Sequence, residues 1–289
     1  MDFRDLVFLS VAEFRSFTKA SKELYISQPA VTKHIKELEE SLGCKLFNRN
    51  GPNITLTEEG KTTYFHLNKI KRDYRELYNN LTPVGETTKS EINIGCSTTV
   101  SNYIIPGILA DYAMGNKGVR LNMLSGNSLD IEKKLLNNVI DLILVENSSS
   151  SSGITYLNYL EDEIIAVCGR GTLYSKQRSI SKNEIKTIPI ITRESGSGTL
   201  EVINNEIQDK FNIQHTIGSS EGIKRFLKNF NGLALISNKA VTYELNRGEL
   251  VKIDIDGLKI KRSIRIGYRK GHLPPTIKRL IDFIRHYNF

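Results

Sequence analysis

Residues 25–43, YISQPAVTKHIKELEESLG, constrain the fold more than any other stretch of the chain. Ser27 is a suitable N-cap, and Pro29 falls in the first helical turn, where its missing N–H breaks no internal hydrogen bond. Apolar residues then recur at intervals of four, three and four, at Val31, Ile35, Leu38 and Leu42. Gly43 provides the stop. The segment therefore predicts a helix with a narrow apolar stripe, which needs other helices to pack against.

Two preceding segments predict those partner helices. Residues 2–14, DFRDLVFLSVAEF, space their apolar side chains as a buried helix does, and residues 17–24, FTKASKEL, form a short helix that Ser16 can cap. A short helix, a tight turn and the helix after Ser27 make a helix-turn-helix, whose second helix can enter the major groove of DNA.

A β-hairpin is predicted next, in the sequence CKLFNRNGPNITLT. Two apolar pairs flank the turn-forming residues NRNGPN, which places Arg49 near the tip of a wing, within reach of a phosphate or the minor groove. The same pattern also fits a plain three-helix bundle with a hairpin, in which the polar helix face is only solvated.

The net charge of +8 does not decide between these alternatives. Residues 1–60 hold eight Lys/Arg and nine Asp/Glu, a net charge of −1, whereas the last 32 residues hold nine basic and one acidic side chain, 9 − 1 = +8. Between residues 15 and 36, however, five basic residues accompany one acid. Local charge near the helix-turn-helix is therefore the better argument for a nucleic-acid partner.

The run from Phe17 to Gly60 resembles the DNA-binding domain of the LysR-type transcriptional regulators. The matching motifs are A-S-x-x-L-x-x-S-Q-P-A-V-T-x-x-I-x-x-L-E-x-x-L-G over residues 20–43, L-F-x-R over 46–49 and L-T-x-x-G over 56–60. The resemblance implies a DNA-binding set at the start of the third helix and in the wing: Ser27, Gln28, Pro29, Ala30, Thr32, Lys33, His34 and Arg49. Lys33 and His34 stand where the family commonly has arginine and glutamine, and lysine cannot make the bidentate contact of arginine.

A long linker helix is predicted after the wing, from a cap at Thr57 to about Leu81. Its apolar residues follow a heptad seam, at Leu67, Ile70, Tyr74, Leu77 and Leu81. Such a seam favours pairing with a second copy of the chain, although packing on the protein's own domain is an alternative. Residues 82–90, TPVGETTKS, are interpreted as a hinge.

From residue 91 the pattern changes to alternating strands and helices, typical of an α/β domain with mostly parallel sheets. The expected strands are INIGCS, VRLNML, IDLILVE, DEIIAVCG, IPIITRE, GLALIS and IRIGYRK. This part resembles the LysR-type effector domain, a periplasmic-binding-protein-like pair of subdomains. The expected fold class is therefore α+β overall, with a winged helix-turn-helix over 1–58, linker helix and hinge over 59–90, and an effector domain over 91–289. Subdomain I comprises 91–162 and 268–289, and subdomain II comprises 163–267.

Small polar residues follow a strand in each half of this domain. Ligands of such sheets bind beyond the carboxyl ends of strands, where helix amino termini favour anions. The predicted effector-binding residues are Ser97, Thr98, Thr99, Asn127, Arg193, Ser195, Gly196, Ser197, Gly198 and Thr199. A small anion or carboxylate is the expected effector, although each loop taken alone also fits simple helix capping. Cys96 borders the first loop, where a role in sensing oxidants is a further alternative.

The combination of STT, GNS and RESGSGT resembles the LysR-type regulators of sulfur assimilation and carbon fixation. That subgroup often has arginine after GSGT, where this chain has Leu200, so the ligands of the subgroup are not carried over. Arg193, Asn127 and Lys224 are the candidates to supply polarity or charge instead. The basic segment IKRSIRIGYRK could face solvent, another subunit or DNA.

The sequence offers no legible catalytic motif, cofactor signature or metal-ligand spacing, so no enzymatic activity, cofactor or metal is expected. Acidic residues near the amino terminus and the lack of a long apolar run favour a cytoplasmic protein. The family resemblance implies promoter DNA, a small-molecule effector, RNA polymerase and copies of the chain itself, as homodimer or homotetramer, as partners, and no membrane. The alternative is a cytoplasmic small-molecule-binding α/β protein or enzyme with an accessory helical domain.

Overall fold

The computed structural model describes residues 1–289 except 51–52, 82–89, 147–150, 207–210, 272 and 288–289. The expected hinge thus lies mostly outside the described residues. The chain divides into two compact units, one made of the elements up to α4 and one of the elements from β3 onward. Each unit is described by itself.

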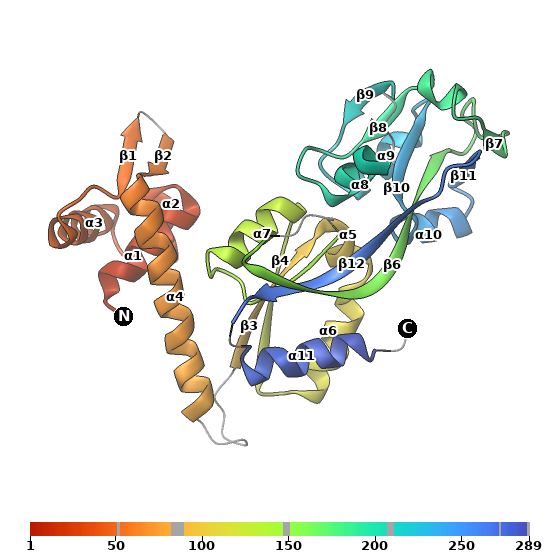
Figure 1. Ribbon diagram of the computed structural model, residues 1–289. Coiled ribbons are helices and arrows are strands. Elements are labelled where there is room, and N and C mark those ends of the chain that lie inside the picture. Colours follow the sequence, from red (N-terminus) through yellow and green to blue (C-terminus); the bar gives the residue numbers. More distant parts are fainter. Residues whose placement is uncertain (51–52, 82–89, 147–150, 207–210, 272, 288–289) are drawn as a thin grey trace. The chain divides into compact units, whose positions relative to one another are not determined.

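The first unit is a helix-turn-helix with a two-stranded wing and a long following helix (Figure 1). Its elements are α1 (Phe3–Phe14), α2 (Phe17–Glu23), α3 (Gln28–Leu42), β1 (Phe47–Asn50), β2 (Asn53–Leu56) and α4 (Glu58–Leu81). The core joins all three short helices to the wing, through side chains such as Phe8, Ala20, Ile35 and Leu46. The predicted helices and hairpin are confirmed.

The ends of α3 follow the predicted chemistry. The Ser27 hydroxyl accepts a hydrogen bond from the Ala30 N–H at 3.3 Å, and Gly43 takes the left-handed backbone conformation (φ +70°) that ends the helix. The prediction that Leu42 completes the apolar stripe is wrong, because its side chain is 50% exposed. Glu39 is buried instead, and its carboxylate accepts hydrogen bonds from the Leu46 N–H at 2.9 Å and the Lys45 ammonium at 2.8 Å.

The start of α4 fits closely against the wing. The Thr57 hydroxyl accepts from the Gly60 N–H at 2.9 Å and donates to the Lys45 carbonyl at 2.7 Å. A Cβ atom at Gly60 would lie 2.1 Å from the Leu46 carbonyl oxygen. The glycine of the L-T-x-x-G motif therefore permits a close approach that no larger residue allows.

The second unit contains a ten-stranded mixed sheet in the order β4-β3-β5-β12-β6-β10-β8-β9, in which β11 also pairs with β6, and β7 pairs with β11. Its strands are β3 (Ser90–Ser97), β4 (Val119–Gly126), β5 (Leu142–Val145), β6 (Ile154–Gly169), β7 (Ser179–Ile180), β8 (Ile190–Thr192), β9 (Ile213–Thr216), β10 (Leu233–Ser237), β11 (Leu250–Ile255) and β12 (Ile260–Arg269). Its helices are α5 (Thr98–Tyr103), α6 (Ile105–Gly115), α7 (Ser128–Leu136), η1 (Glu184–Lys186), α8 (Gly198–Glu206), α9 (Ser220–Leu227), α10 (Asn238–Asn246) and α11 (Pro275–Arg285).

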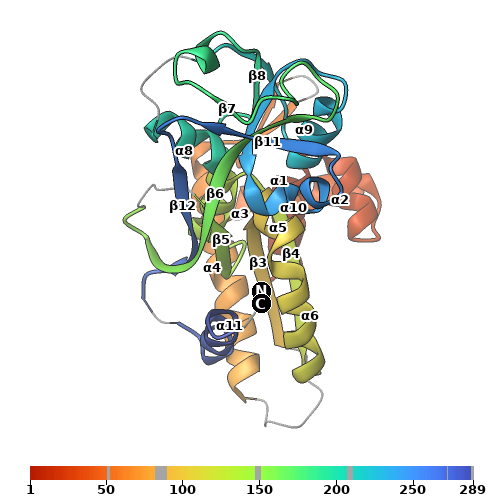
Figure 2. The same ribbon diagram turned by 90° about the vertical axis from the view of Figure 1, so that its right-hand side faces the viewer.

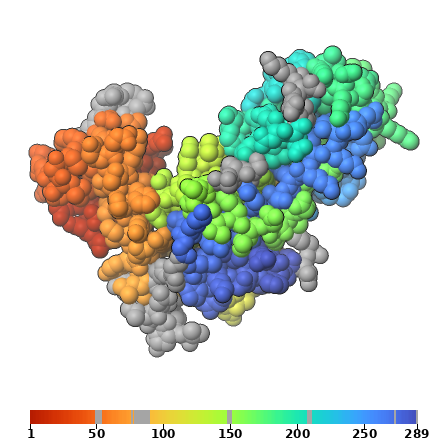
Figure 3. Space-filling model, viewed as in Figure 1, coloured from red at the N-terminus to blue at the C-terminus, as the bar shows by residue number. Residues whose placement is uncertain are grey.

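Two subdomains with separate cores divide this sheet. One core packs α5, α6 and α11 on the strands of the first subdomain, and two further cores cover both faces of the strands of the second. The long strands β6 and β12 run antiparallel to each other from one subdomain to the other (Figures 1 and 2). In the space-filling view the two subdomains form two lobes (Figure 3).

The structure differs from the predicted strands at these crossings. β6 begins at Ile154, eight residues before the expected strand, and pairs antiparallel with both β12 and β10. Ile264 and Ile266 pack in the core of the first subdomain while Ile260 packs in that of the second. These contacts favour a second crossing within β12 rather than at residue 268. Strands β7, β9 and β11 were not expected from the sequence.

Candidate functional site

The first half of α3 carries most of the predicted DNA-binding residues. Ser27, Gln28, Pro29 and Lys33 are exposed, whereas Ala30, Thr32 and His34 are partly buried. The Thr32 hydroxyl donates to the Gln28 carbonyl at 3.2 Å, which orients its methyl group away from that oxygen. The Lys33 ammonium lies 3.8 Å from the Glu37 carboxylate. Gln28, Pro29 and Lys33 are thus accessible on the surface of this unit.

His34 and Arg49 differ from this group. The His34 ring lies edge-on to Phe3 of α1 with centroids 5.3 Å apart, and its Nδ1 lies 3.7 Å from Glu37. His34 thus contributes to helix packing. Arg49 pairs with Ile54 in the backbone ladder of the wing, and its side chain lies outside the described residues.

The predicted seam of α4 is largely exposed in the single chain. Leu67 packs against the core of the first unit, but about half of each of the next three seam side chains, Ile70, Tyr74 and Leu77, is accessible. The Leu81 side chain lies outside the described residues. An apolar stripe of this kind on a long helix is suited to a second helix.

The predicted effector loops come together at a narrow cleft between the two subdomains, whose walls lie so close that it has no room for a water molecule in this structure. The first subdomain contributes the ends of β3 and β4, and the second contributes the end of β8 and the start of α8. The lining residues are Ser97, Thr98, Thr99, Gly126, Asn127, Ser128, Glu146, Arg193, Ser197, Gly198 and Thr199. Ser195 and Gly196 belong to the same loop but are not in this lining.

Backbone conformation brings the loops together. Ser97 caps α5, accepting from the Val100 N–H at 3.2 Å, and the Asn127 side-chain oxygen accepts from the Asp130 N–H at 3.0 Å. Gly196 has a left-handed backbone (φ +83°), and its carbonyl accepts a 3.4 Å hydrogen bond from the Leu129 N–H of the other subdomain. Asn127 and Gly196 therefore shape the cleft.

Arg193 lies deep in the cleft, with 2% of its surface exposed. Its Nε and Nη2 donate to the two oxygens of Glu194 at 2.8 and 2.9 Å, and its Nη1 lies 3.5 Å from the Ser220 hydroxyl. The charge of Arg193 is thus already matched by a neighbouring carboxylate.

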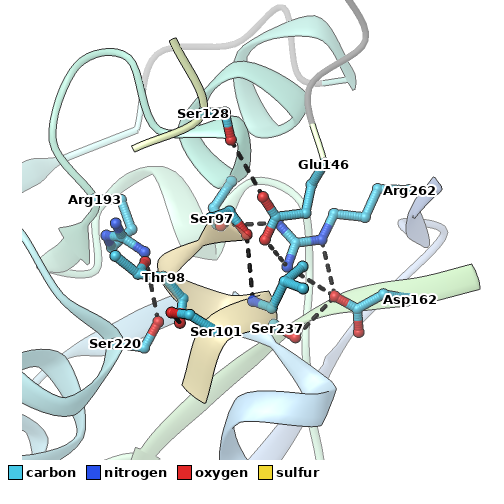
Figure 4. Close-up of polar contacts among 12 residues, drawn as sticks. Ser97, Thr98, Ser101, Ser128, Glu146, Asp162, Arg193, Ser220, Ser237 and Arg262 are labelled. Atoms are coloured by element: carbon cyan, nitrogen blue, oxygen red, sulfur yellow. Dashed lines mark hydrogen bonds and ion pairs between the residues drawn. The ribbon is translucent and has the colours of Figure 1, made fainter. Parts of the chain in front are cut away.

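Three buried charged residues in or beside the cleft, Glu146, Asp162 and Arg262, were not expected from the sequence as part of the site (Figure 4). Arg262 of β12 donates from Nε to Asp162 at 2.8 Å and from Nη1 to the Thr199 hydroxyl at 2.8 Å. Its Nη2 lies 3.5 Å from Glu146, whose other oxygen accepts from the Ser128 hydroxyl at 3.2 Å. Ser237 also donates to Asp162, at 2.8 Å. Arg262 therefore links both crossing strands to a lining residue from each subdomain.

One of these residues had a signal in the sequence. Glu146 directly follows the apolar run of β5, so the rule that ligands bind beyond strand ends could have found it. Arg262 belongs to the basic segment whose direction was left open, and the structure buries it rather than exposing it to solvent or DNA.

Lys224 and Cys96 lie outside the cleft lining. The Lys224 ammonium bonds Glu221 at 2.6 Å and Glu244 at 2.8 Å, so its pKa is raised despite burial, which acts in the opposite direction. Tyr103 of α5 donates to Glu221 at 2.5 Å; burial and this bond raise the pKa of Tyr103 to about 12. These groups tie the subdomains together. Burial also raises the pKa of the Cys96 thiol, which disfavours the reactive thiolate.

Within the described ranges, no group of three or more His, Cys, Asp or Glu is placed to hold a metal ion. Likewise, none of the helices that the structure describes is long and apolar enough to cross a membrane.

The chain matches two protein-family descriptions that together cover almost its whole length. "LysR substrate binding domain" matches residues 85–288, and "Bacterial regulatory helix-turn-helix protein, lysR family" matches residues 6–61. Among curated relatives, the transcriptional activator CmpR of Synechocystis sp. is 28% identical over 96% of this chain and 92% of its own length. The RuBisCO operon transcriptional regulator of Allochromatium vinosum is 26% identical over 96% and 93%. These relatives confirm the resemblance to the carbon-fixation subgroup.

Solved structures share the fold. Full-length CbnR in complex with its target DNA has a TM-score of 0.70 at 18% identity, covering 99% of each chain. The regulatory domain of Synechocystis PCC6803 CcmR in complex with 2-PG (2-phosphoglycolate) has a TM-score of 0.62 at 23% identity, covering 68% of this chain and 95% of the other. The chain therefore belongs to the LysR family: it is a DNA-binding transcriptional regulator whose larger, carboxyl-terminal part is the substrate-binding domain of that family.

Proposed function

We propose that the effector of this regulator is a small anion that binds in the cleft between the two subdomains. The observation that carries the proposal is the convergence of hydroxyl groups with the amino termini of α7 and α8 at one cleft. Helix amino termini and backbone N–H groups favour negative charge. The related CcmR domain holds 2-PG, which is an anion and supports the same ligand class here.

Binding would act through the relative arrangement of the two subdomains. A ligand shifts a conformational equilibrium only by its difference in affinity for the two states. An anion that contacts Thr99 of one subdomain and Ser197 of the other requires a cleft wider than the one in this structure, and both contacts together would hold the cleft at that width. The effector thus favours one arrangement of the effector domain, and promoter binding or activation changes with it.

The experiment compares anion binding by two serine variants of one loop. Ser197→Ala removes a hydroxyl that lines the cleft, whereas Ser195→Ala removes an exposed hydroxyl just outside it. In a thermal-shift screen of small carboxylates and phosphorylated acids, we expect hits to raise the melting temperature of the wild type and Ser195→Ala alike. Their effect on Ser197→Ala is expected to be weaker. Equal responses of both variants would place the ligand elsewhere.

We further propose that the exposed face of α3 reads promoter DNA, with Gln28, Thr32 and Lys33 towards the bases, and that Arg49 contacts the backbone. The partly buried His34 is expected to act mainly through helix packing. Operator footprints that are unchanged in a Thr32→Ala/Lys33→Ala double variant would remove this assignment. Because the relatives are transcriptional regulators, we propose no catalytic activity, and a cytoplasmic location beside the promoter DNA.

The seam on α4 is proposed to pair two chains into a dimer, which reads two half-sites. Leu77→Lys places a charge in the exposed apolar stripe, whereas Lys69→Ala changes a neighbouring exposed residue. In light scattering we expect Leu77→Lys to lower the molar mass of the assembly and Lys69→Ala to leave it unchanged. A Leu77→Lys variant that keeps the wild-type mass would show that the seam is not the contact.

A further inference from the structure

A carboxylate stands in the cleft that is proposed to bind an anion. Glu146 lines the cleft and is 3% exposed, in the middle of the polar residues of Figure 4. One of its oxygens accepts from Ser128, the first residue of α7, at 3.2 Å. The other lies 3.5 Å from Arg262, beyond the usual length of a strong charge-assisted hydrogen bond.

The neighbouring guanidinium groups are committed to other carboxylates. Nε of Arg262 donates to Asp162 at 2.8 Å, while its Nη2 lies 2.8 Å from the same oxygen without forming a hydrogen bond among the described residues, and Arg193 makes two hydrogen bonds to Glu194. Beside the cleft there are therefore three carboxylates for these two guanidinium groups. Among the described residues, Glu146 is the carboxylate of this set with the longest ion pair.

An ionised carboxylate accepts hydrogen bonds and donates none. A fully deprotonated oxyanion such as sulfate also only accepts, so beside Glu146 it would meet charge repulsion without a shared hydrogen atom. Low dielectric surroundings strengthen this repulsion. An anion that carries an O–H or N–H group can instead donate it to Glu146 and direct its charge towards the helix amino termini.

We infer that Glu146 is a specificity-determining residue that admits anions carrying a hydrogen-bond donor and rejects oxyanions that lack one. The inference rests on the proposed function, because it requires an anion in this cleft. It narrows the effector to hydroxy acids, amino acids, protonated phosphate groups or ligands of the same chemistry. An anion that has a suitable charge and size but lacks a hydrogen-bond donor is expected to be rejected.

Inorganic phosphate and sulfate test the inference directly, because both carry about two negative charges near pH 7.5 and only phosphate keeps a proton. Titration calorimetry on the full chain is expected to show phosphate binding roughly 10- to 100-fold more tightly than sulfate, the discrimination expected of one charge-assisted hydrogen bond. Arsenate and selenate repeat the comparison with larger ions. The wild-type protein therefore shows by itself whether protonated oxyanions are preferred over unprotonated ones.

The variant Glu146→Gln keeps the side-chain shape and supplies an amide donor. We expect it to bind sulfate, so that the preference for phosphate falls to about threefold or less. Glu194→Gln is the matched control, because it removes the same charge beside Arg193 but lies outside the cleft lining. It is expected to change the affinities for both ions together and to keep their ratio.

The possible failures are distinct. Equal binding of phosphate and sulfate by the wild type would overturn the role of Glu146 and leave the anion site standing. An unchanged ratio in a folded Glu146→Gln variant would do the same. If none of the four ions binds to the wild type or to Glu146→Gln, while both chains melt cooperatively, the cleft does not bind small inorganic oxyanions and the inference about Glu146 falls, whereas the thermal-shift screen of carboxylates and phosphorylated acids separately decides the proposed anion site.

Discussion

Two lysines on α3 have nearly identical surroundings but different expected roles. Lys33 is 76% exposed with Glu37 at 3.8 Å, and Lys36 is 71% exposed with Glu40 at 3.6 Å. Exposed ion pairs of this kind contribute little to stability. Alanine at either position should therefore leave the fold intact, and any difference between them reports on DNA.

We expect Lys33→Ala to weaken operator binding by about 1–3 kcal/mol if the ammonium reads a base. Lys36→Ala, further along the helix, should cause a smaller loss that is the same for operator and unrelated DNA, because a phosphate contact carries no sequence information. Fluorescence anisotropy at about 0.15 M salt measures the affinity of each variant for operator DNA and for unrelated DNA. Equal losses on operator DNA would mean that Lys33 is only a phosphate contact.

Glu39 gives the first unit a pH-dependent stability. Burial raises the pKa of its carboxyl. The hydrogen bonds from Lys45 and from the Leu46 N–H together lower the pKa by more than burial raises it, so the folded-state pKa lies below the ordinary 4.5. The contribution of Glu39 to the stability of the first unit is thus fully present above pH 4.5 and is lost as the pH falls through the folded-state pKa.

Glu39→Gln should destabilise the first unit by about 1–2 kcal/mol at pH 7, since it weakens a buried hydrogen-bond acceptor. The difference in the free energy of unfolding between this variant and the wild type should shrink as the pH falls from 5 to 3. Urea unfolding followed by circular dichroism at several pH values checks this. The variant Glu40→Gln, an exposed neighbour, should follow the wild type throughout.

At the scale of elements, the contact between wing and α4 depends on one missing side chain. A Cβ atom at Gly60 would lie 2.1 Å from the Leu46 carbonyl oxygen, whereas one at Gly107, in helix α6, would meet no atom within 4 Å. Both glycines are helical, so alanine raises the intrinsic helix propensity equally.

We expect the two alanine substitutions to have opposite effects. Gly107→Ala should stabilise the protein by about 0.5–1 kcal/mol, whereas Gly60→Ala should destabilise the first unit by about 2 kcal/mol or more, because backbone must move. Calorimetric melting of both variants makes the comparison. Stabilisation by Gly60→Ala would show that wing and helix are not in close contact.

Local chemistry explains why the first unit was predictable. Its helices are bounded by Ser16, Ser27 and Gly43, which act on their own neighbours in sequence. The crossing of β6 and β12 pairs residues about a hundred positions apart, such as Arg262 with Asp162, so no local pattern reports it. The sequence ITYLNYLE, residues 154–161, therefore carries no predicted strand.

The difference between local signals and long-range pairing also explains which residues of the cleft could be predicted from the sequence and which could not. The serine and threonine loops follow strands and precede helices, a pattern that can be read in a few residues. Arg262 reaches the cleft only because β12 crosses between subdomains, and its neighbours Lys261 and Lys259 made the segment look like a solvated charge run. The direction of a charged side chain on such a strand is set by tertiary pairing.

For the whole molecule, Arg262 joins the crossing strands to both subdomains. Its side chain is 1% exposed between Glu146 and Asp162, so its loss would leave two buried carboxylates without their cation. We expect Arg262→Met to destabilise the second unit by about 3–5 kcal/mol. Adding Asp162→Asn should restore part of the loss, since it removes one unpaired charge.

Lys261→Met is the matched control, because Lys261 neighbours Arg262 on β12 and is exposed. Denaturant unfolding of the three variants should show a large loss for Arg262→Met, a partial recovery in the double variant and little change for Lys261→Met. A stability of Arg262→Met close to that of wild type would indicate that the buried network contributes little to cohesion of the subdomains.

The ladder between β6 and β12 contains a register shift between Ile264 and Arg265, within the part of β12 that packs in the core of the first subdomain. A bulge bends a strand and increases its local twist, whereas the paired strands on either side resist sliding along each other. The two subdomains are therefore connected by a paired ribbon that can bend or twist more easily than it can slide. A change in the width of the cleft is then expected to be a rotation of one lobe relative to the other, with the strand register unchanged.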